Sequence, residues 1–160
     1  MTTVAILTIS DSALAGTRED TSGPALRTRC EELGWRVMAF AVVGDEQRAI
    51  SAKLLEWCEA AAASLVLTTG GTGVAARDIT PEATRIVLER EIPGLAELMR
   101  ARGLEQNRFS ALSRGVAGTR GKCLIVNLPG SPKGALFSFD VIEPLIQHVI
   151  DLLHGRTAHG

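Results

Sequence analysis

The sequence feature that most constrains the fold is a repeated pairing of a short apolar run with a polar loop. Each run is rich in β-branched and aliphatic residues, and each leads directly into serine, glycine, threonine, proline or aspartate. Apolar runs of this length, bounded by turn residues, indicate buried strands. Helical segments separate most of the runs, so we expect right-handed βαβ units and a mostly parallel sheet. The four runs cover residues 4–9, 35–43, 65–68 and 123–128.

The helices expected between these strands have recognisable ends. Gly34 is a typical C-terminal stop for the first helix. Asp45 is predicted as the N-cap of the second helix, and Thr80 with Pro81 as the N-cap and first residue of the third. Glu82 then lies near the positive end of that third helix. The expected helices cover residues 24–33, 46–63, 81–92, 95–102 and 137–153.

A small β-hairpin is predicted in the second half of the chain. Residues 116–117 and 123–128 flank a turn at residues 119–121. The fold class is therefore α/β, with a mostly parallel sheet flanked by helices. At 160 residues the chain fits one domain, which we expect to span residues 1–155, with residues 156–160 as a frayed C-terminal tail.

Composition argues against several classes of function. The net charge is −1 and tyrosine is absent, so we expect neither a basic surface nor an aromatic platform for nucleic acid. Cys30, Cys58 and Cys123 are far apart and form no CxxC pair, which supports neither a disulfide framework nor a zinc site. No apolar run is long enough to span a bilayer, and no basic leader precedes the first strand. We therefore predict a reduced cytoplasmic protein with no nucleic-acid partner and no membrane partner.

The glycine loop after the third strand points to phosphate chemistry. Residues 68–73 read TTGGTG, and their three glycines let backbone N–H groups approach an anion. The loop lacks the Gly-Lys-Ser/Thr ending of a Walker A motif, which excludes a P-loop nucleoside triphosphatase. It fits the G-x-G-x-x-A dinucleotide pattern, but it follows the third strand instead of the first. The alternative to an anion site is a loop whose glycines only permit tight packing.

Three aspartates follow three of the predicted strands. Asp11, Asp45 and Asp78 each have a local explanation, as an Asx-turn, a helix N-cap or an ion-pair partner of Arg77. Because the loops after parallel strands gather at one edge of a sheet, the same residues are also expected to lie close together. Carboxylates that crowd a phosphate need a hard cation such as Mg²⁺ between them. Both interpretations stay open on the residues alone.

A second tight loop follows the last strand. Residues 129–134 read PGSPKG, which fits either a rigid connection to the final helix or a second backbone cradle. In the second interpretation Ser131 is a donor and Lys133 is a phosphate partner. Ser113 and Arg114 form another hydroxyl–cation pair, which the local sequence places on the surface.

No protein nucleophile is predicted. His148, His154 and His159 lie in or after the final helix without an evident acid–base partner in the sequence, and we interpret them as bystanders. The sequence shows no Ser/His/Asp or Cys/His arrangement of the kind that activates a nucleophile.

Taken together, these motifs resemble the molybdopterin adenylyltransferase family of molybdenum cofactor biosynthesis, which is related to the G domain of gephyrin. The resemblance runs from about residue 4 to about residue 153. Its most specific block joins TTGGTG at 68–73 to RDITPEAT at 77–84. The supporting blocks are ISDS at 9–12, SGP at 22–24, GDE at 44–46, LSR at 112–114 and NLPGSPK at 127–133.

The resemblance implies a single three-layer α/β domain, the molybdopterin-binding fold, that assembles as a homotrimer. It implies transfer of AMP from Mg-ATP to the terminal phosphate of molybdopterin, and a molybdenum-insertion enzyme as a further partner. The residues that match catalytic positions of the family are Asp45, Asp78 and Ser113, and Asp45 with Asp78 would hold Mg²⁺. The substrate-binding residues expected on this basis are Ser10, Asp11, Thr69, Gly70, Gly71, Thr72, Gly73, Pro129, Gly130, Ser131 and Lys133.

Three other functions stay open from the sequence. A non-catalytic paralogue that binds molybdopterin or nucleotide would carry the same motifs. A partner-binding scaffold is permitted by the gephyrin relationship, although the chain shows no linker or second domain. A dehydrogenase that uses NAD is the weakest of the three. The presence of Asp45, Asp78 and Ser113 together favours the active enzyme.

Overall fold

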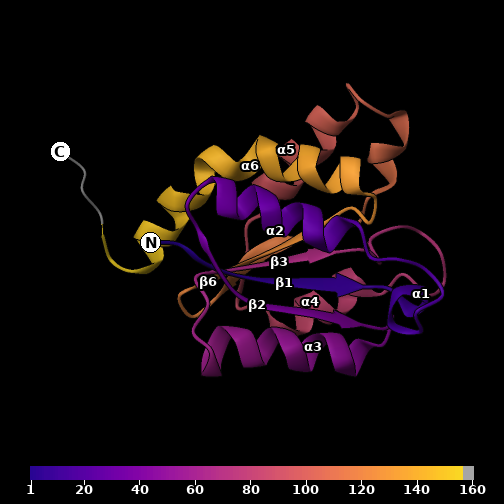
Figure 1. Ribbon diagram of the computed structural model, residues 1–160. Coiled ribbons are helices and arrows are strands. Elements are labelled where there is room, and N and C mark those ends of the chain that lie inside the picture. Colours follow the sequence, from indigo (N-terminus) through magenta and orange to yellow (C-terminus); the bar gives the residue numbers. More distant parts are fainter. Residues whose placement is uncertain (157–160) are drawn as a thin grey trace.

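A six-stranded sheet with the order β2-β1-β3-β6-β5-β4 runs through the computed structural model, which describes residues 1–156 (Figure 1). Strands β1, β2, β3 and β6 are parallel, whereas β5 runs antiparallel to both β6 and β4. The predicted α/β class and the predicted hairpin, formed by β5 and β6, are both confirmed. The strands are β1 (Thr3–Ile9), β2 (Arg36–Val43), β3 (Leu65–Thr69), β4 (Arg90–Glu91), β5 (Ala117–Arg120) and β6 (Cys123–Leu128).

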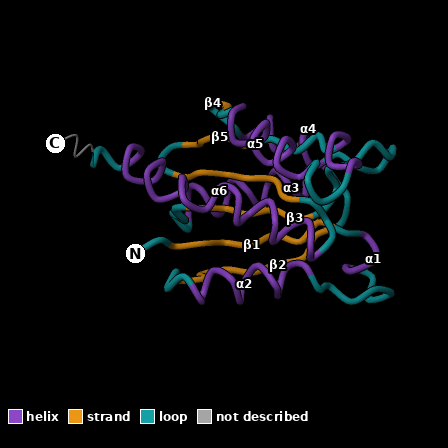
Figure 2. The backbone as a smooth tube through the Cα atoms, turned by 90° about the horizontal axis from the view of Figure 1, so that it is seen from above, coloured by secondary structure: helices purple, strands orange, loops and turns teal. Residues whose placement is uncertain are grey.

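Helices cover both faces of this sheet and make three layers (Figure 1; Figure 2). On one face α2, α5 and α6 bury Leu26, Met99 and Phe139 against the sheet. On the other face α3 and α4 bury Leu54 and Val87. Every residue of β3 and β6 is buried, which explains why these strands are apolar without alternation. The helices are α1 (Asp11–Leu14), α2 (Ser22–Glu32), α3 (Gln47–Leu55), α4 (Thr80–Val87), α5 (Pro93–Gly103) and α6 (Pro132–Leu153).

The second predicted helix differs from its expected course at both ends. Asp45 is not its N-cap: Glu46 holds that position, without a side-chain hydrogen bond to the helix. The Asp45 carboxylate instead accepts a hydrogen bond from the backbone of Asp11, a residue of the neighbouring loop. The α-helix ends at Leu55 and continues as a π-helix, η1 (Glu56–Ala60), so it does not reach residue 63 as an α-helix.

The third predicted helix is shorter than expected. Thr80 is its first residue and Ile79 its N-cap, and the Thr80 hydroxyl donates to the carbonyl oxygen of Gly70 instead of capping the helix. The helix ends at Val87, and Glu91, expected in helical sequence, lies in strand β4. Pairing of β4 with β5 extends the sheet at this edge and explains the early stop.

Other element ends also moved. The final helix begins at Pro132 instead of residue 137, because the Ser131 hydroxyl caps it by accepting from the N–H group of Gly134. The hairpin turn lies at Gly121 and Lys122, since β5 continues to Arg120. Two short helices were not predicted: α1, and the 3₁₀ helix η2 (Arg108–Leu112).

Arg156, the first residue of the expected C-terminal tail, forms an ion pair of 3.0 Å with Asp151. Residues 157–160, which include His159, lie outside the described residues. Among the described helices, none combines the length and apolar character that a membrane crossing requires.

A buried polar network connects the sheet to the start of α4. The Asn127 side chain donates to the hydroxyls of Thr68 and Thr84, at 3.0 Å each, and accepts from the N–H group of Val116 at 3.1 Å. Thr84 donates in turn to the carbonyl oxygen of Thr80 at 2.7 Å. Asn127, Thr68, Thr80 and Thr84 are all buried, so each of these hydrogen bonds replaces water that cannot enter.

We expect Asn127→Ala to lower the free energy of unfolding by about 2–4 kcal/mol, because it leaves the buried Thr68 hydroxyl and the buried Val116 N–H group without a partner. Asn107→Ala is the matched control for stability: the side chain of that asparagine caps η2 and is exposed, so its loss should cost about 1 kcal/mol or less. Urea unfolding followed by circular dichroism measures both values. Equal midpoints for the two variants would contradict a structural role for the network.

Candidate active site

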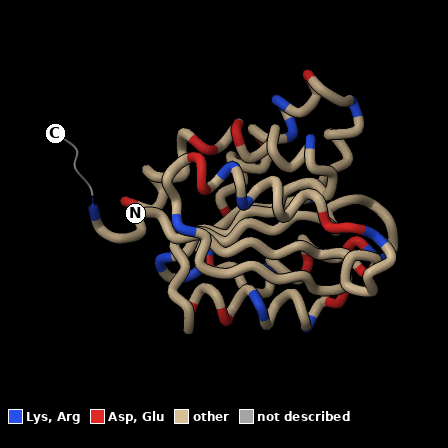
Figure 3. The backbone as a smooth tube through the Cα atoms, in the orientation of Figure 1, with Lys and Arg blue, Asp and Glu red and all other residues tan. Residues whose placement is uncertain are grey.

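Four loops meet at the carboxyl ends of the parallel strands, at the end of the sheet where α1 lies (Figure 1). The convergence expected from the sequence is thus observed. Acidic and basic segments lie beside one another at this end (Figure 3). The loops enclose two cavities, of about 590 Å³ and about 340 Å³. Four residues line both cavities, namely Gly71, Asp78, Gly130 and Ser131.

The glycine loop has a backbone that other residues would not adopt. Gly70 and Gly71 have φ angles of +105° and +68°, in the region that L side chains rarely occupy. A Cβ on Gly70 would collide with the carbonyl oxygen of Ile9, and one on Gly71 with the hydroxyl of Thr80. Thr80 fastens the loop, since its hydroxyl donates to the carbonyl of Gly70 at 2.9 Å and its N–H group to that of Gly71 at 3.1 Å.

The backbone N–H groups of residues 71–74 have no acceptor within residues 1–156. Gly71, Thr72, Gly73 and Val74 all line the larger cavity. Unpaired N–H groups in a turn form a concave site for an anion. The loop therefore has backbone donors of the kind that the predicted anion site requires.

Two aspartates lock two of the loops together. The N–H group of Asp11 donates to the Asp45 carboxylate at 3.1 Å, and the N–H group of Asp45 donates to the Asp11 carboxylate at 2.8 Å. Arg77 forms an ion pair of 3.0 Å with Asp11, although both side chains are largely exposed. Partial burial raises the pKa of Asp45, and the nearby charges of Asp11 and Asp78 raise it further. This corner of the site therefore carries more negative charge than its own residues neutralise.

Asp78 stands between the two cavities. It lines the smaller one together with Asp45 and the larger one together with Ser113. Its carboxylate accepts from the N–H group of Ala75 at 3.0 Å, which fixes it against the glycine loop. The three residues that match catalytic positions thus surround the shared wall, but Asp45 and Ser113 face different cavities.

Three further predicted residues line the smaller cavity, and the polar group of each already forms a hydrogen bond within the protein. Ser10 caps α1 by accepting from the N–H group of Ala13 at 3.2 Å. Thr69 donates to the carbonyl oxygen of Pro129 at 2.6 Å and so fastens one loop to the other. Asp11 holds Asp45 as described above. These three hydrogen bonds hold the loops that form the smaller cavity.

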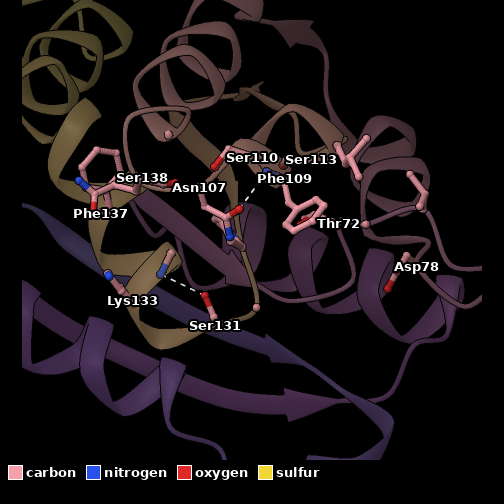
Figure 4. Close-up of a pocket in the computed structure, with 18 of the residues that line it drawn as sticks. Thr72, Asp78, Asn107, Phe109, Ser110, Ser113, Ser131, Lys133, Phe137 and Ser138 are labelled. Atoms are coloured by element: carbon pink, nitrogen blue, oxygen red, sulfur yellow. Dashed lines mark hydrogen bonds between the residues drawn. The ribbon is translucent and has the colours of Figure 1, made fainter.

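The loop after β6 forms the opposite wall of the larger cavity, which Figure 4 shows with Ser131 and Lys133 on one side and Ser113 on the other. Pro129 and Gly130 complete this wall. The 22 residues of α6 begin here, so the positive end of a long helix lies beside the cavity. Within residues 1–156, Lys133 has no carboxylate within ion-pair distance.

The segment around η2 supplies a wall that the sequence analysis missed. Phe109, Leu112 and Asn107 line the larger cavity from this side, and Phe137 lines it from α6 (Figure 4). The Phe109 side chain is 61% exposed, with the Arg108 guanidinium 5.3 Å from its ring. An aromatic residue among polar neighbours in a chain with four phenylalanines and no tyrosine was the available signal.

Arg114, placed on the surface by its local sequence, is a central contact of the glycine loop. Its guanidinium donates to the carbonyls of Gly73 and Asp78 and to both oxygens of Glu82. Ser113 beside it lines the cavity, and its hydroxyl accepts from Gly115 at 3.3 Å. By contrast, His148 and His154 belong to the far half of α6 and its end, where the His154 ring contacts the carbonyl of Ile150.

The donor set suits Mg²⁺ if substrate oxygens complete it. Among the described residues, no group of three or more His, Cys, Asp or Glu side chains is arranged to hold a metal ion. Asp45 and Asp78 nevertheless share the smaller cavity and repel one another, and a cation there would relieve that repulsion. Mg²⁺ is commonly held by one or two carboxylates with phosphate oxygens and water as the other ligands.

Comparison with known proteins agrees with this geometry. Residues 5–148 match the family described as a probable molybdopterin binding domain. The molybdopterin adenylyltransferase of Helicobacter pylori strain J99 is 41% identical over 155 residues, which are 96% of this chain and 88% of that protein. The Drosophila melanogaster molybdenum cofactor synthesis protein cinnamon is 41% identical over 94% of this chain, which spans 25% of the fly protein.

A solved structure extends the likeness to three dimensions. The molybdopterin biosynthesis enzyme MoaB from Thermus thermophilus superposes with a TM-score of 0.92 at 49% sequence identity. The match covers 97% of this chain and 98% of that one. Motifs, fold and site geometry lead to the same conclusion. The chain belongs to the molybdopterin adenylyltransferase family of molybdenum cofactor biosynthesis.

Proposed function

We propose that the chain transfers AMP from Mg-ATP to the terminal phosphate of molybdopterin at the wall shared by its two cavities. In this reaction an oxygen of the molybdopterin phosphate bonds to the α-phosphorus of ATP, and the bond to pyrophosphate breaks. Two phosphorylated substrates must therefore meet phosphate to phosphate. The observation that carries the proposal is the wall that the two cavities share. It consists of small loop residues and one carboxylate: Gly71, Gly130, Ser131 and Asp78.

The larger cavity suits the fused ring of one substrate. Phe109, Phe137, Leu112 and Val74 give it an apolar wall, and Asn107 adds a polar group at its edge. Heteroaromatic rings stack favourably on aromatic side chains. The smaller cavity is lined mainly by polar and charged residues, which suits a phosphate chain.

The chemical step requires positioning and charge neutralisation. Both reacting phosphates are anionic, so donors that hold them in line lower the barrier directly. The N–H groups of residues 71–74 and the Lys133 ammonium are the donors available at the larger cavity. No protein nucleophile is needed, which agrees with the chemistry of the residues present.

Asp45 and Asp78 are the residues that would hold Mg²⁺. When bound, the metal would supply positive charge for the leaving pyrophosphate. Ser113 lines the larger cavity, where its hydroxyl would contact a substrate phosphate.

The assembly and the next partner are also proposals. The family resemblance supports a homotrimer and a molybdenum-insertion enzyme that takes the product. Exposed apolar side chains on α4 and α6, Ile86, Leu145 and Leu152, supply surface that subunit contacts would cover. Light scattering should give a mass three times the 17.0 kDa of one chain.

The first test is adenylylation by the Asp78→Asn variant. We expect it to bind molybdopterin like the wild type and to lose turnover about 100-fold, because the amide keeps the shape but not the charge. Asp151→Asn, at the far end of α6, is the matched control and should remain active. Mass spectrometry of the adenylylated product measures turnover. Full activity of Asp78→Asn would remove this residue from the mechanism.

Asp45→Asn should make the protein more stable while lowering its activity. Because the folded state raises the pKa of Asp45, ionisation of this residue weakens folding as the pH rises through its titration range. The asparagine carbonyl still accepts from Asp11 but carries no charge. The melting temperature should therefore rise by about 2–4 °C at pH 7, and the gain should shrink toward pH 4. A gain that is independent of pH would contradict this electrostatic explanation.

Phe109→Ala tests the ring assignment. We expect KM for one of the two substrates to rise about tenfold while KM for the other changes little, because a single ring loses its stacking partner. Leu104→Ala, an exposed apolar residue outside the cavity lining, is the control. The substrate whose KM rises is the one in the larger cavity. Two unchanged KM values would exclude Phe109 from substrate binding.

A further inference from the structure

Arg114 lies on the side of the glycine loop that faces away from the larger cavity. It lines a separate hollow between α4 and α5, and it is not part of the cavity lining although both of its neighbours in the loop, Gly73 and Asp78, are. The guanidinium Nε donates to the carbonyl of Gly73 at 2.7 Å, and Nη2 donates to the carbonyl of Asp78 at 2.6 Å. Its own backbone N–H group donates to the carbonyl of Thr72 at 2.8 Å.

These contacts determine the direction of the loop's N–H groups. In a trans peptide the carbonyl of one residue and the N–H group of the next point to opposite sides of the chain. No cis peptide occurs in the described chain. Because the carbonyls of Thr72 and Gly73 point toward Arg114, the N–H groups of Gly73 and Val74 point the other way. Both residues line the larger cavity, and neither N–H group has an acceptor in residues 1–156.

Glu82 holds the Arg114 guanidinium in the position from which it contacts the loop carbonyls. The Glu82 carboxylate accepts from Nη1 of Arg114 at 3.0 and 2.9 Å and from Nη2 at 3.0 Å. Arg114 lowers the pKa of Glu82, so the pair stays ionised at neutral pH. Glu82 lies in the first turn of α4, which links the loop to a rigid helix. Only a planar guanidinium has donors in enough directions for two carbonyls and a carboxylate, and a lysine ammonium does not reproduce this fork.

We propose that Arg114, held by Glu82, is a positioning residue for adenylyl transfer: it holds the carbonyls of the glycine loop on one side so that the N–H groups of Gly73 and Val74 face the substrate phosphate on the other. It also keeps Asp78 in place through that residue's carbonyl. Arg114 itself touches no substrate. The inference rests on the proposed function in one respect, the placing of a phosphate at this loop.

The test compares Arg114→Ala and Arg114→Lys with a matched control, Arg120→Ala. Arg120 resembles Arg114: it pairs with a carboxylate, Glu59, at 2.7 Å and donates to a backbone carbonyl, that of Val87, at 3.0 Å. It does not line either cavity of the site. Both alanine variants lose an ion pair and contact with backbone carbonyls, two in Arg114→Ala and one in Arg120→Ala, so the control carries a loss of stability of the same kind.

We expect kcat to fall about 50-fold in Arg114→Ala and about tenfold in Arg114→Lys, with smaller changes in KM, because loop geometry matters most in the transition state. Arg120→Ala should keep wild-type kcat. Millimolar guanidinium chloride should restore part of the activity of Arg114→Ala, whereas equal sodium chloride or urea should not. Circular dichroism and melting temperatures identify any variant that is unfolded, and the lysine variant then carries the comparison.

Binding of pyrophosphate, measured by calorimetry, separates this inference from the proposed function. We expect Arg114→Ala to bind pyrophosphate at least about fivefold more weakly than the wild type and Arg120→Ala to bind it equally well. If Arg114→Ala keeps both its kcat and its pyrophosphate affinity while Asp78→Asn is inactive, the role of Arg114 is wrong and the proposed function stands. If the wild type forms no adenylylated product but binds pyrophosphate at least about fivefold more tightly than Arg114→Ala does, the function is wrong and the positioning role stands.

Discussion

The site depends on a chain of buried hydrogen bonds that starts at the Asn127 side chain and ends at the carbonyl of Gly70. Asn127 holds Thr84, Thr84 donates to the carbonyl of Thr80, and the Thr80 hydroxyl donates to Gly70. All four residues are buried, so water does not compete for these hydrogen bonds. The network therefore favours a single arrangement of the four residues. It fixes the start of α4 and the glycine loop to the centre of the sheet. The start of the glycine loop is therefore held by the core of the protein.

The loop that results has two sides with opposite roles. Near its start, Thr80 holds the carbonyls of Gly70 and Gly71, and farther along Arg114 holds those of Gly73 and Asp78. The polar backbone groups left for the larger cavity are therefore N–H groups, beside the carboxylate of Asp78. The carboxylates of the smaller cavity are less well compensated than the carbonyls of the glycine loop. Burial and the neighbouring charges of Asp11 and Asp78 raise the pKa of Asp45. In the function proposed above, this unneutralised negative charge would attract Mg²⁺, and the raised pKa means that the charge costs stability while the cation is absent.

The sequence predicted those parts of the structure that depend on local pattern. Strand positions, the sheet class, the hairpin and the four converging loops follow from apolar runs and turn residues. It was wrong where a side chain has a local and a distant partner to choose from. Asp45 and Thr80 both suit an N-cap, but one binds Asp11 and the other Gly70. Arg114 looked like a surface residue because its partners, Gly73, Asp78 and Glu82, lie 32 to 41 positions away in the chain.

The division between backbone and side chains has a consequence for specificity. The proposed phosphate cradle consists of backbone groups that core and ion-pair contacts hold in place, so its contacts with a phosphate would be independent of the substrate's ring. The ring would meet a different wall, built by η2 and the start of α6, whose contacts are apolar and partly exposed. Changes at Phe109 or Leu112 can therefore alter which ring is accepted without disturbing Gly70 or Asp78. In the proposed reaction this arrangement separates the residues that would select the ring from those that would hold the reacting phosphates.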